Sequence, residues 1–226
     1  MSHLINIFLE PGKVFAELKE KPTFLVPLLL VALVSSAMTF MYFMQVDGVW
    51  FIDHTLQASG NEMSAAELAQ MKSVMPGAKM MGYIALVTTP IGIAIVTLLM
   101  ALYYLIAGKV TGSAVGFKHG MSLATWSSLP MLLGTIVALV GVFMMSPQTS
   151  LESLMLTNLD PLLVQLPIDS PWKKLASSFS LLTFWSIFLG ALGWKVWGKT
   201  SWAEAITVAI IPGVLIYGAM ALLALI

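Results

Sequence analysis

The sequence contains no cysteine and no arginine, and only 10% of its residues are charged. Without cysteine the chain forms no disulfide, holds no thiolate zinc site and has no cysteine nucleophile. Its 11 basic residues are all lysines and are balanced by 11 acidic residues. A nucleic-acid-binding surface needs an excess of basic residues, usually with arginine, so we expect no nucleic-acid partner.

Apolar residues dominate the composition of the chain. They make up 58% of the chain, and the mean hydropathy is +0.91. A soluble domain of 226 residues with this composition would expose large apolar patches to water. We therefore expect the surroundings of this protein to be lipid.

Five uncharged runs are each long enough for a helix to cross the ~30 Å hydrocarbon core, which takes about 20 residues. The uncharged runs cover residues 22–46, 80–108, 120–151, 175–194 and 205–226. They predict spans at about 23–46, 80–107, 120–145, 175–195 and 204–226. The runs are continuously apolar rather than alternating, which favours helices over the strands of a barrel. The sequence predicts an all-α polytopic membrane protein with a five-helix membrane domain over residues 23–226.

Residues 1–22 predict a short amphipathic helix ahead of the first run. Pro11 suits the first turn of a helix, and Val14, Phe15 and Leu18 then share one face. The segment has too many charges for a signal peptide, so we expect it to stay attached. Its apolar face has two possible placements, on the membrane surface or against the cytoplasmic ends of the bundle.

Two long segments between the runs are rich in acidic residues and are expected outside the cell. In residues 47–79, Ser64 and Glu67 make a capping box, which predicts a surface helix that ends at Pro76. Asp53 and His54 in the same segment have no third ligand nearby, which favours a solvated loop over an acid–base or metal pair.

The second acidic segment, residues 146–174, contains four prolines. Within it residues 151–166 are apolar enough to lie against the interface or to re-enter shallowly, but the prolines argue against a sixth crossing. We expect this segment to lie outside, over the bundle.

Glycines recur at every fourth position near the middle of the chain, beside two lysines and a histidine; they are Gly108, Gly112, Gly116 and Gly120. Such spacing occurs where membrane helices touch, but glycine this dense beside charges favours a turn at the membrane surface. We predict that Lys109, Lys118 and His119 belong to a basic hinge over residues 108–120 that contacts lipid headgroups.

The distribution of lysines predicts the orientation. With the N-terminus inside, the cytoplasmic segments hold seven lysines and the external segments hold four. Lysine is enriched in cytoplasmic loops, so the N-terminus is predicted to be cytoplasmic and Ile226, after an odd number of crossings, external. The short segment 195–204 carries tryptophans beside lysines, which is typical of an interface anchor.

Four prolines lie inside the runs, at Pro27, Pro90, Pro130 and Pro212, and we predict that they break or kink their helices. Each proline frees a backbone carbonyl that a neighbour must satisfy. Broken helices build substrate sites in transporters, yet no ionisable side chain lies in any run to couple a proton or sodium ion.

Hydroxyl side chains within the runs could line a pore: Ser35, Ser36, Thr39, Thr88, Thr89, Ser127 and Ser128. Such hydroxyls more often bond to a carbonyl of their own helix. The three histidines lie on different segments, and no metalloprotease or phosphate-loop spacing occurs. We expect a protein that is not an enzyme and binds no cofactor.

Three stretches together resemble the Yip family of five-span membrane proteins, named for interaction with Ypt/Rab GTPases, and in particular its short prokaryotic members. They are FLEPGKVFAELKEKPTFLVPLL from Phe8, LYYLIAGKVTGSAVGFKHGMSLATWSSLPMLL from Leu102, and SWAEAITVAIIPGVLI from Ser201. Trp126 stands where the family often has a tyrosine. The resemblance implies five helices with a cytoplasmic N-terminus, in agreement with the lysine count.

The expected function is that of a scaffold or adaptor in the cell (inner) membrane, which binds the lipid bilayer and other membrane proteins or further copies of itself. The alternative is a small channel or transporter for a solute, not coupled to protons or sodium through an intramembrane carboxylate. The two differ in whether a water-filled path crosses one subunit.

Overall fold

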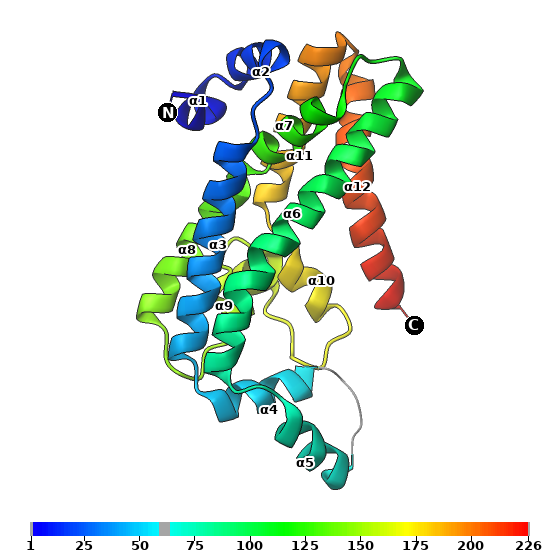
Figure 1. Cartoon of the computed structure of the whole chain (residues 1–226). Helices are drawn as coiled ribbons and strands as arrows, with labels where there is room; N and C mark the ends of the chain where they lie inside the picture. The colour runs from blue at the N-terminus through cyan, green and yellow to red at the C-terminus, as the bar shows by residue number, and fades with distance from the viewer. Residues whose placement is uncertain (1, 59–63, 226) are drawn as a thin grey trace.

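The computed structural model describes residues 2–58 and 64–225, and most of these residues are helical. Figure 1 shows an elongated bundle with α1 (Ser2–Leu9) and α2 (Pro11–Glu20) at one end and α4 (Gly48–Ala58) and α5 (Ala65–Val74) at the other. We call these the lysine end, which holds α2 and the turn at residues 112–116, and the acidic end, which holds α4 and α5. The predicted all-α class is confirmed.

Three helices are long and apolar enough to cross a membrane: α3 (Leu25–Gln45), α6 (Ala78–Thr111) and α12 (Trp202–Leu223). Two further helices, α7 (Phe117–Ser127) and α8 (Leu129–Met144), bend by 40° at Ser128 and make a fourth span if they cross as one. By length and composition the described chain thus has three or four spanning helices, where the sequence predicted five.

The difference lies in the predicted run 175–195. Its helix, α11 (Leu182–Gly198), begins seven residues later than expected, because Ser180 pairs with Asn158 in an isolated antiparallel bridge. Leu159 N–H donates to the Phe179 carbonyl at 2.8 Å, and Leu181 N–H donates to the Thr157 carbonyl at 2.9 Å. This pairing ends the short helix α10 (Lys173–Ser178) and delays the start of α11.

Residues 151–181 fold back against the bundle instead of lying over it, through α9 (Leu151–Leu154), the π-helical turn η1 (Asp160–Val164) and α10. Thr157 is so close to Gly134 that a Cβ at that glycine would lie 2.5 Å from the Thr157 hydroxyl. Gly134 precedes the last residue of α8, Met144, by ten residues, or about 15 Å of helix. This part of residues 151–166 therefore packs along the side of α8, well before that helix ends.

A buried ion pair holds this segment together. Lys173 Nζ lies 2.5 Å from Asp160 Oδ2, and the Leu166 N–H donates to Asp160 Oδ1 at 2.8 Å. Burial of the Asp160 carboxyl raises its pKa, but the hydrogen bonds from Lys173 and Leu166 and the Lys173 charge outweigh burial, so the pKa lies below its ordinary value. The carboxylate is therefore the stable form in the folded chain.

The predicted capping box is present at the start of α5. The Glu67 N–H donates to the Ser64 hydroxyl, and the Glu67 carboxylate accepts from the Ser64 N–H at 2.8 Å. Residues 48–58, expected as a loop, instead form α4. Asp53 pairs there with Lys72 at 2.6 Å and His54 lies against the Trp50 ring, so the two neighbours do not act as a pair.

The central glycines divide between a turn and helix contacts. Gly112 has φ of 72°, the left-handed conformation that ends α6, and the turn covers residues 112–116. Gly120 lies inside α7, where a Cβ would come within 2.6 Å of the Ala101 carbonyl oxygen of α6. The predicted hinge over 108–120 is therefore too long, and Gly120 serves the close helix contact that was given less weight.

Candidate functional site

The apolar face of α2 is packed against the bundle rather than against lipid. Val14, Phe15 and Leu18 are at most 1% exposed. The Trp197 Nε1–H of α11 donates to the Phe15 carbonyl at 2.6 Å, and Lys19 Nζ donates back to the Trp197 carbonyl at 2.8 Å. Of the two placements that the sequence allowed, the structure has the one against the ends of the helices.

His119, which lies on α7, also helps to hold α2 in place. Its Nε2 lies 3.0 Å from the Lys19 carbonyl, and its ring meets the Trp197 ring edge-on, with 5.4 Å between centroids. Lys109, in the last turn of α6, and Lys118, in the first turn of α7, are exposed. Of the three residues predicted to form a basic surface, two face outward and His119 turns inward as a joint between α2, α7 and α11.

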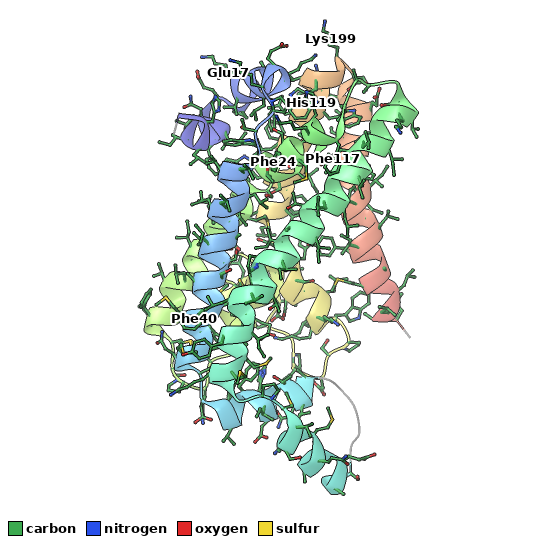
Figure 2. The ribbon with its side chains drawn as sticks, viewed as in Figure 1. Glu17, Phe24, Phe40, Phe117, His119 and Lys199 are labelled. Atoms are coloured by element: carbon green, nitrogen blue, oxygen red, sulfur yellow. The ribbon has the colours of Figure 1, made fainter. Side chains whose placement is uncertain are left out.

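Seven lysines belong to the segments gathered at the lysine end: Lys13, Lys19, Lys21, Lys109, Lys118, Lys195 and Lys199. Figure 2 shows Lys199, His119 and Glu17 at this end, far from Phe40. Lys195 lies over the Trp202 ring, with 5.4 Å from Nζ to the centroid. Four glutamates, Glu10, Glu17, Glu20 and Glu204, belong to the same segments, so this surface carries an excess of positive charge.

The four prolines predicted to break helices occupy two kinds of position. Pro27 lies in the first turn of α3, and Pro130 is the second residue of α8, just after the bend at Ser128. Proline fits there because the first turn of a helix has no internal acceptor for its N–H. Pro90 and Pro212 lie inside α6 and α12, and both helices continue through them.

Two backbone carbonyls near these prolines are bonded by aromatic side chains. Pro212 leaves the Val208 carbonyl of α12 without its helical donor, and the Tyr103 hydroxyl of α6 donates to it at 2.7 Å. The Thr23 carbonyl lies just before α3, and Trp126 Nε1–H of α7 donates to it at 2.7 Å. The hydrocarbon core of a membrane contains no water that could donate a hydrogen bond to a free carbonyl. The two side-chain bonds therefore satisfy these carbonyls and also hold neighbouring segments together.

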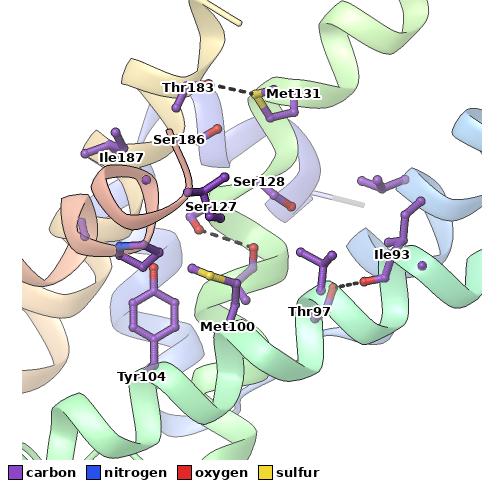
Figure 3. A pocket seen from close by; sticks show the side chains of 18 of the residues that line it. Ile93, Thr97, Met100, Tyr104, Ser127, Ser128, Met131, Thr183, Ser186 and Ile187 are labelled. Carbon is purple, nitrogen blue, oxygen red and sulfur yellow. Dashed lines mark hydrogen bonds between the residues drawn. The ribbon is translucent and has the colours of Figure 1, made fainter. Parts of the chain in front are cut away.

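A cavity of about 680 Å³ lies between α6 and α12. Its walls come from α6, α12, α11 and the α7–α8 bend, with one residue of α3. Figure 3 shows Met100 and Tyr104 of α6 facing Ser127 and Ile187 across it.

The cavity wall is apolar apart from hydroxyl groups. Ser127 and Ser128 donate to the carbonyls of Ala124 and Thr125 in α7, and Thr97 donates to Ile93 in its own helix at 2.8 Å. Ser186 Oγ is the exception, since it is buried and has no hydrogen-bond partner in the described part of the chain. The predicted back-bonding of hydroxyls thus leaves little polar surface in the cavity.

Four of the hydroxyls predicted for a pore do line this cavity: Thr88, Thr89, Ser127 and Ser128. The three on α3 do not contribute to its wall. Thr39 of α3 instead donates to the Ser35 carbonyl at 2.9 Å.

No metal or cofactor cluster forms within residues 2–58 and 64–225, where no three metal-binding side chains come together. His3 pairs with Glu17 at 2.7 Å, and His54 and His119 lie in the separate settings described above. The arrangement offers surfaces and a cavity for binding.

Sequence reasoning missed Gly92 and Gly213, which line the cavity, and Tyr103, which bonds α6 to α12. A Cβ at Gly92 or at Gly213 would meet no atom within 4 Å, so both glycines face open space. Proline at 212 signalled a freed carbonyl, but the tyrosine that bonds it is 105 residues away along the chain. Nothing in the local sequence joins the two.

The model of the Yip1 domain family matches residues 5–223, nearly the whole chain. Searches among curated proteins and among solved structures give no match. The matched range includes α2, the lysine end and every wall of the cavity.

Proposed function

Because the chain belongs to the Yip1 domain family, we propose that this membrane protein is an adaptor or scaffold that holds other membrane proteins, or further copies of itself, and organises the lipid around it. The observation that carries the proposal is the lysine end. There an amphipathic helix is fixed to the bundle by the Trp197, Lys19 and His119 bonds, and exposed lysines surround it. A rigid cationic surface of this kind suits an anionic leaflet and acidic partners.

The proposal includes five crossings, by α3, α6, the α7–α8 pair, α11 and α12. The 17 residues of α11 extend about 25 Å, close to the ~30 Å of the hydrocarbon core. The lysine end then lies in the cytoplasm and α4, α5 and Leu225 lie outside, in the inner membrane of the cell. Ile226, predicted to be external, is outside the described residues.

The alternative, a small channel or transporter, has less support. The cavity is lined mainly by apolar groups, and its hydroxyls largely bond to their own helices. None of its lining residues is ionisable at neutral pH, so it offers no group for proton or sodium coupling.

The test exchanges charge at the lysine end. Juxtamembrane lysines contribute about 1 kcal/mol each toward anionic lipid, so Lys109→Glu with Lys118→Glu should weaken the preference for anionic over neutral lipid at least tenfold. The measurement is the composition of lipid retained by the protein in mixed-lipid nanodiscs. The matched control is Lys79→Glu with Lys174→Glu, which changes two exposed lysines outside the lysine end. Equal lipid preferences of the two double variants would contradict the proposal.

Crosslinking in native membranes separates the adaptor from the transporter. We expect the wild-type chain to be captured with a protein partner or a second copy, and the Lys109→Glu, Lys118→Glu variant to be captured less. Liposomes that contain the protein and carry a proton or sodium gradient should take up no solute. Accumulation of a solute against its gradient would contradict the adaptor proposal and support the transporter alternative.

A further inference from the structure

We propose that the cavity between α6 and α12 is a binding site for one hydrocarbon chain of a membrane lipid, which enters from the bilayer between the two helices. This site is independent of the lysine end and goes beyond the proposed adaptor function. Its support comes from the cavity's shape, its chemistry and its opening.

The cavity is long. Along α6 its lining runs from Thr88 to Tyr104, sixteen residues or about 24 Å of helix. Its volume is about 680 Å³. A hydrocarbon chain that lies along α6 would follow this length.

The chemistry of the wall matches an alkyl chain. Val31, Ile93 and Val96 contribute aliphatic surface, and Met100 and Met131 contribute flexible thioethers that adapt to an irregular chain. The Thr97 and Ser128 hydroxyls bond to carbonyls of their own segments. Such a wall offers dispersion contacts and has no charge for an ion or a polar solute.

The opening faces lipid. Tyr103 ties α6 to α12 through the Val208 carbonyl at the lysine end, and Figure 1 shows the two helices diverging toward the acidic end. Gly92 and Gly213, on the two helices, both face open space within the cavity lining. At this depth the surrounding solvent is the hydrocarbon of the bilayer, so a lipid chain is the group available to fill the space.

The glycines make a sharp test. Gly213→Leu and Gly92→Leu each place a side chain in open space inside the cavity, so neither needs the backbone to move. Gly218→Leu is the matched control, because Gly218 lies on α12, also faces open space and does not line the cavity. All three replacements exchange a helical glycine for a better helix former, and we expect each variant to fold.

The probe is a phospholipid with a photoactivatable diazirine on its acyl chain, reconstituted with the full-length chain. We expect crosslinks on the wild type to concentrate on the α6 and α12 walls of the cavity and to fall at least fivefold there in Gly213→Leu and Gly92→Leu, with Gly218→Leu unchanged. Equal labelling of Gly213→Leu and Gly218→Leu would show ordinary surrounding lipid and overturn the proposal. Capture of a protein instead of lipid at a photoreactive residue placed at Gly213 would overturn it as well. Neither result bears on the anionic-lipid preference set by Lys109 and Lys118.

Discussion

Pro212 leaves the Val208 carbonyl without its helical donor, and Tyr103, 105 positions away along the chain, supplies the missing bond. The Tyr103 hydroxyl bonds to Val208 and the Trp126 indole bonds to Thr23. The sequence predicted that the carbonyls would need partners, because proline lacks an N–H. It could not name the partners, since the tie between α6 and α12 depends on how the two helices cross.

A double-mutant cycle at Tyr103 and Pro212 measures this tie. Tyr103→Phe removes the donor and leaves the Val208 carbonyl unpaired, which should cost about 1–2 kcal/mol of unfolding free energy in a membrane. In a Pro212→Ala background the backbone N–H gained at position 212 can bond to Val208 within α12, so the same change should cost less. The measurement is reversible unfolding in mixed micelles.

The coupling energy between positions 103 and 212 shows whether the tyrosine hydroxyl replaces the helical bond that proline removes. Tyr104→Phe in both backgrounds is the control, because the Val208 carbonyl bonds to Tyr103 and not to its neighbour. Purely additive effects of Tyr103→Phe and Pro212→Ala would mean that the tyrosine does not replace the bond lost to proline.

At the scale of single elements, α2 was predicted well and residues 146–181 were not. Pro11 and the spacing of Val14, Phe15 and Leu18 are local signals, and the face they define is the one that is buried. The start of α11 depends instead on the pairing of Leu159 with Phe179 across some twenty residues. Composition shows that residues 175–181 are apolar, but it does not predict that pairing.

Trp197 is expected to control the docking of α2. In Trp197→Phe the Phe15 carbonyl loses the 2.6 Å bond from the indole, at a cost of about 1–2 kcal/mol. The amides of α2 should then exchange hydrogen roughly five to thirty times faster, while those of α3 stay unchanged. Trp202→Phe is the control, because Trp202 is 44% exposed and packs over Phe188. Unaltered exchange in α2 would show that the indole bond does not hold the helix.

The Asp160–Lys173 pair predicts a pH dependence. The folded-state pKa of Asp160 lies below its unfolded value of 3.8, so its stabilising contribution is complete well above pH 3.8 and is lost as the pH falls through the lower, folded-state pKa. Asp160→Asn leaves Lys173 without its counter-charge and should lower the unfolding free energy by about 1–3 kcal/mol at pH 7.

Thermal unfolding of the wild type and of Asp160→Asn, compared from pH 7 down to below pH 3.8, checks this dependence. The difference between the two midpoints should shrink as the pH falls. Asp169→Asn is the control, because Asp169 is exposed and makes no ion pair within the described part of the chain. A difference that stays constant across the range would show that the Asp160 charge is not what stabilises the fold of residues 151–181.

For the whole molecule, composition alone was enough to predict a helical membrane protein, since 58% apolar residues in long uncharged runs admit little else. The predicted ends of α3 and α12 differ from the observed ones by only a few residues. The cavity could not be predicted, because it is the space left where α6 and α12 diverge. It depends on angles between helices, which a linear pattern does not record.

The central claim is that the lysine end is cytoplasmic and that an odd number of crossings separates it from the C-terminus. The absence of cysteine makes each introduced thiol unique in the chain. Three exposed positions report on the two sides: Ala16 in α2, Ala66 in α5 and Leu225 near the C-terminus.

A membrane-impermeant maleimide applied to sealed right-side-out vesicles is the most direct measurement. It should label Ala66→Cys and Leu225→Cys at once, and Ala16→Cys only after the vesicles are opened. Labelling of Ala16→Cys and Leu225→Cys from the same side would mean an even number of crossings and would contradict the account.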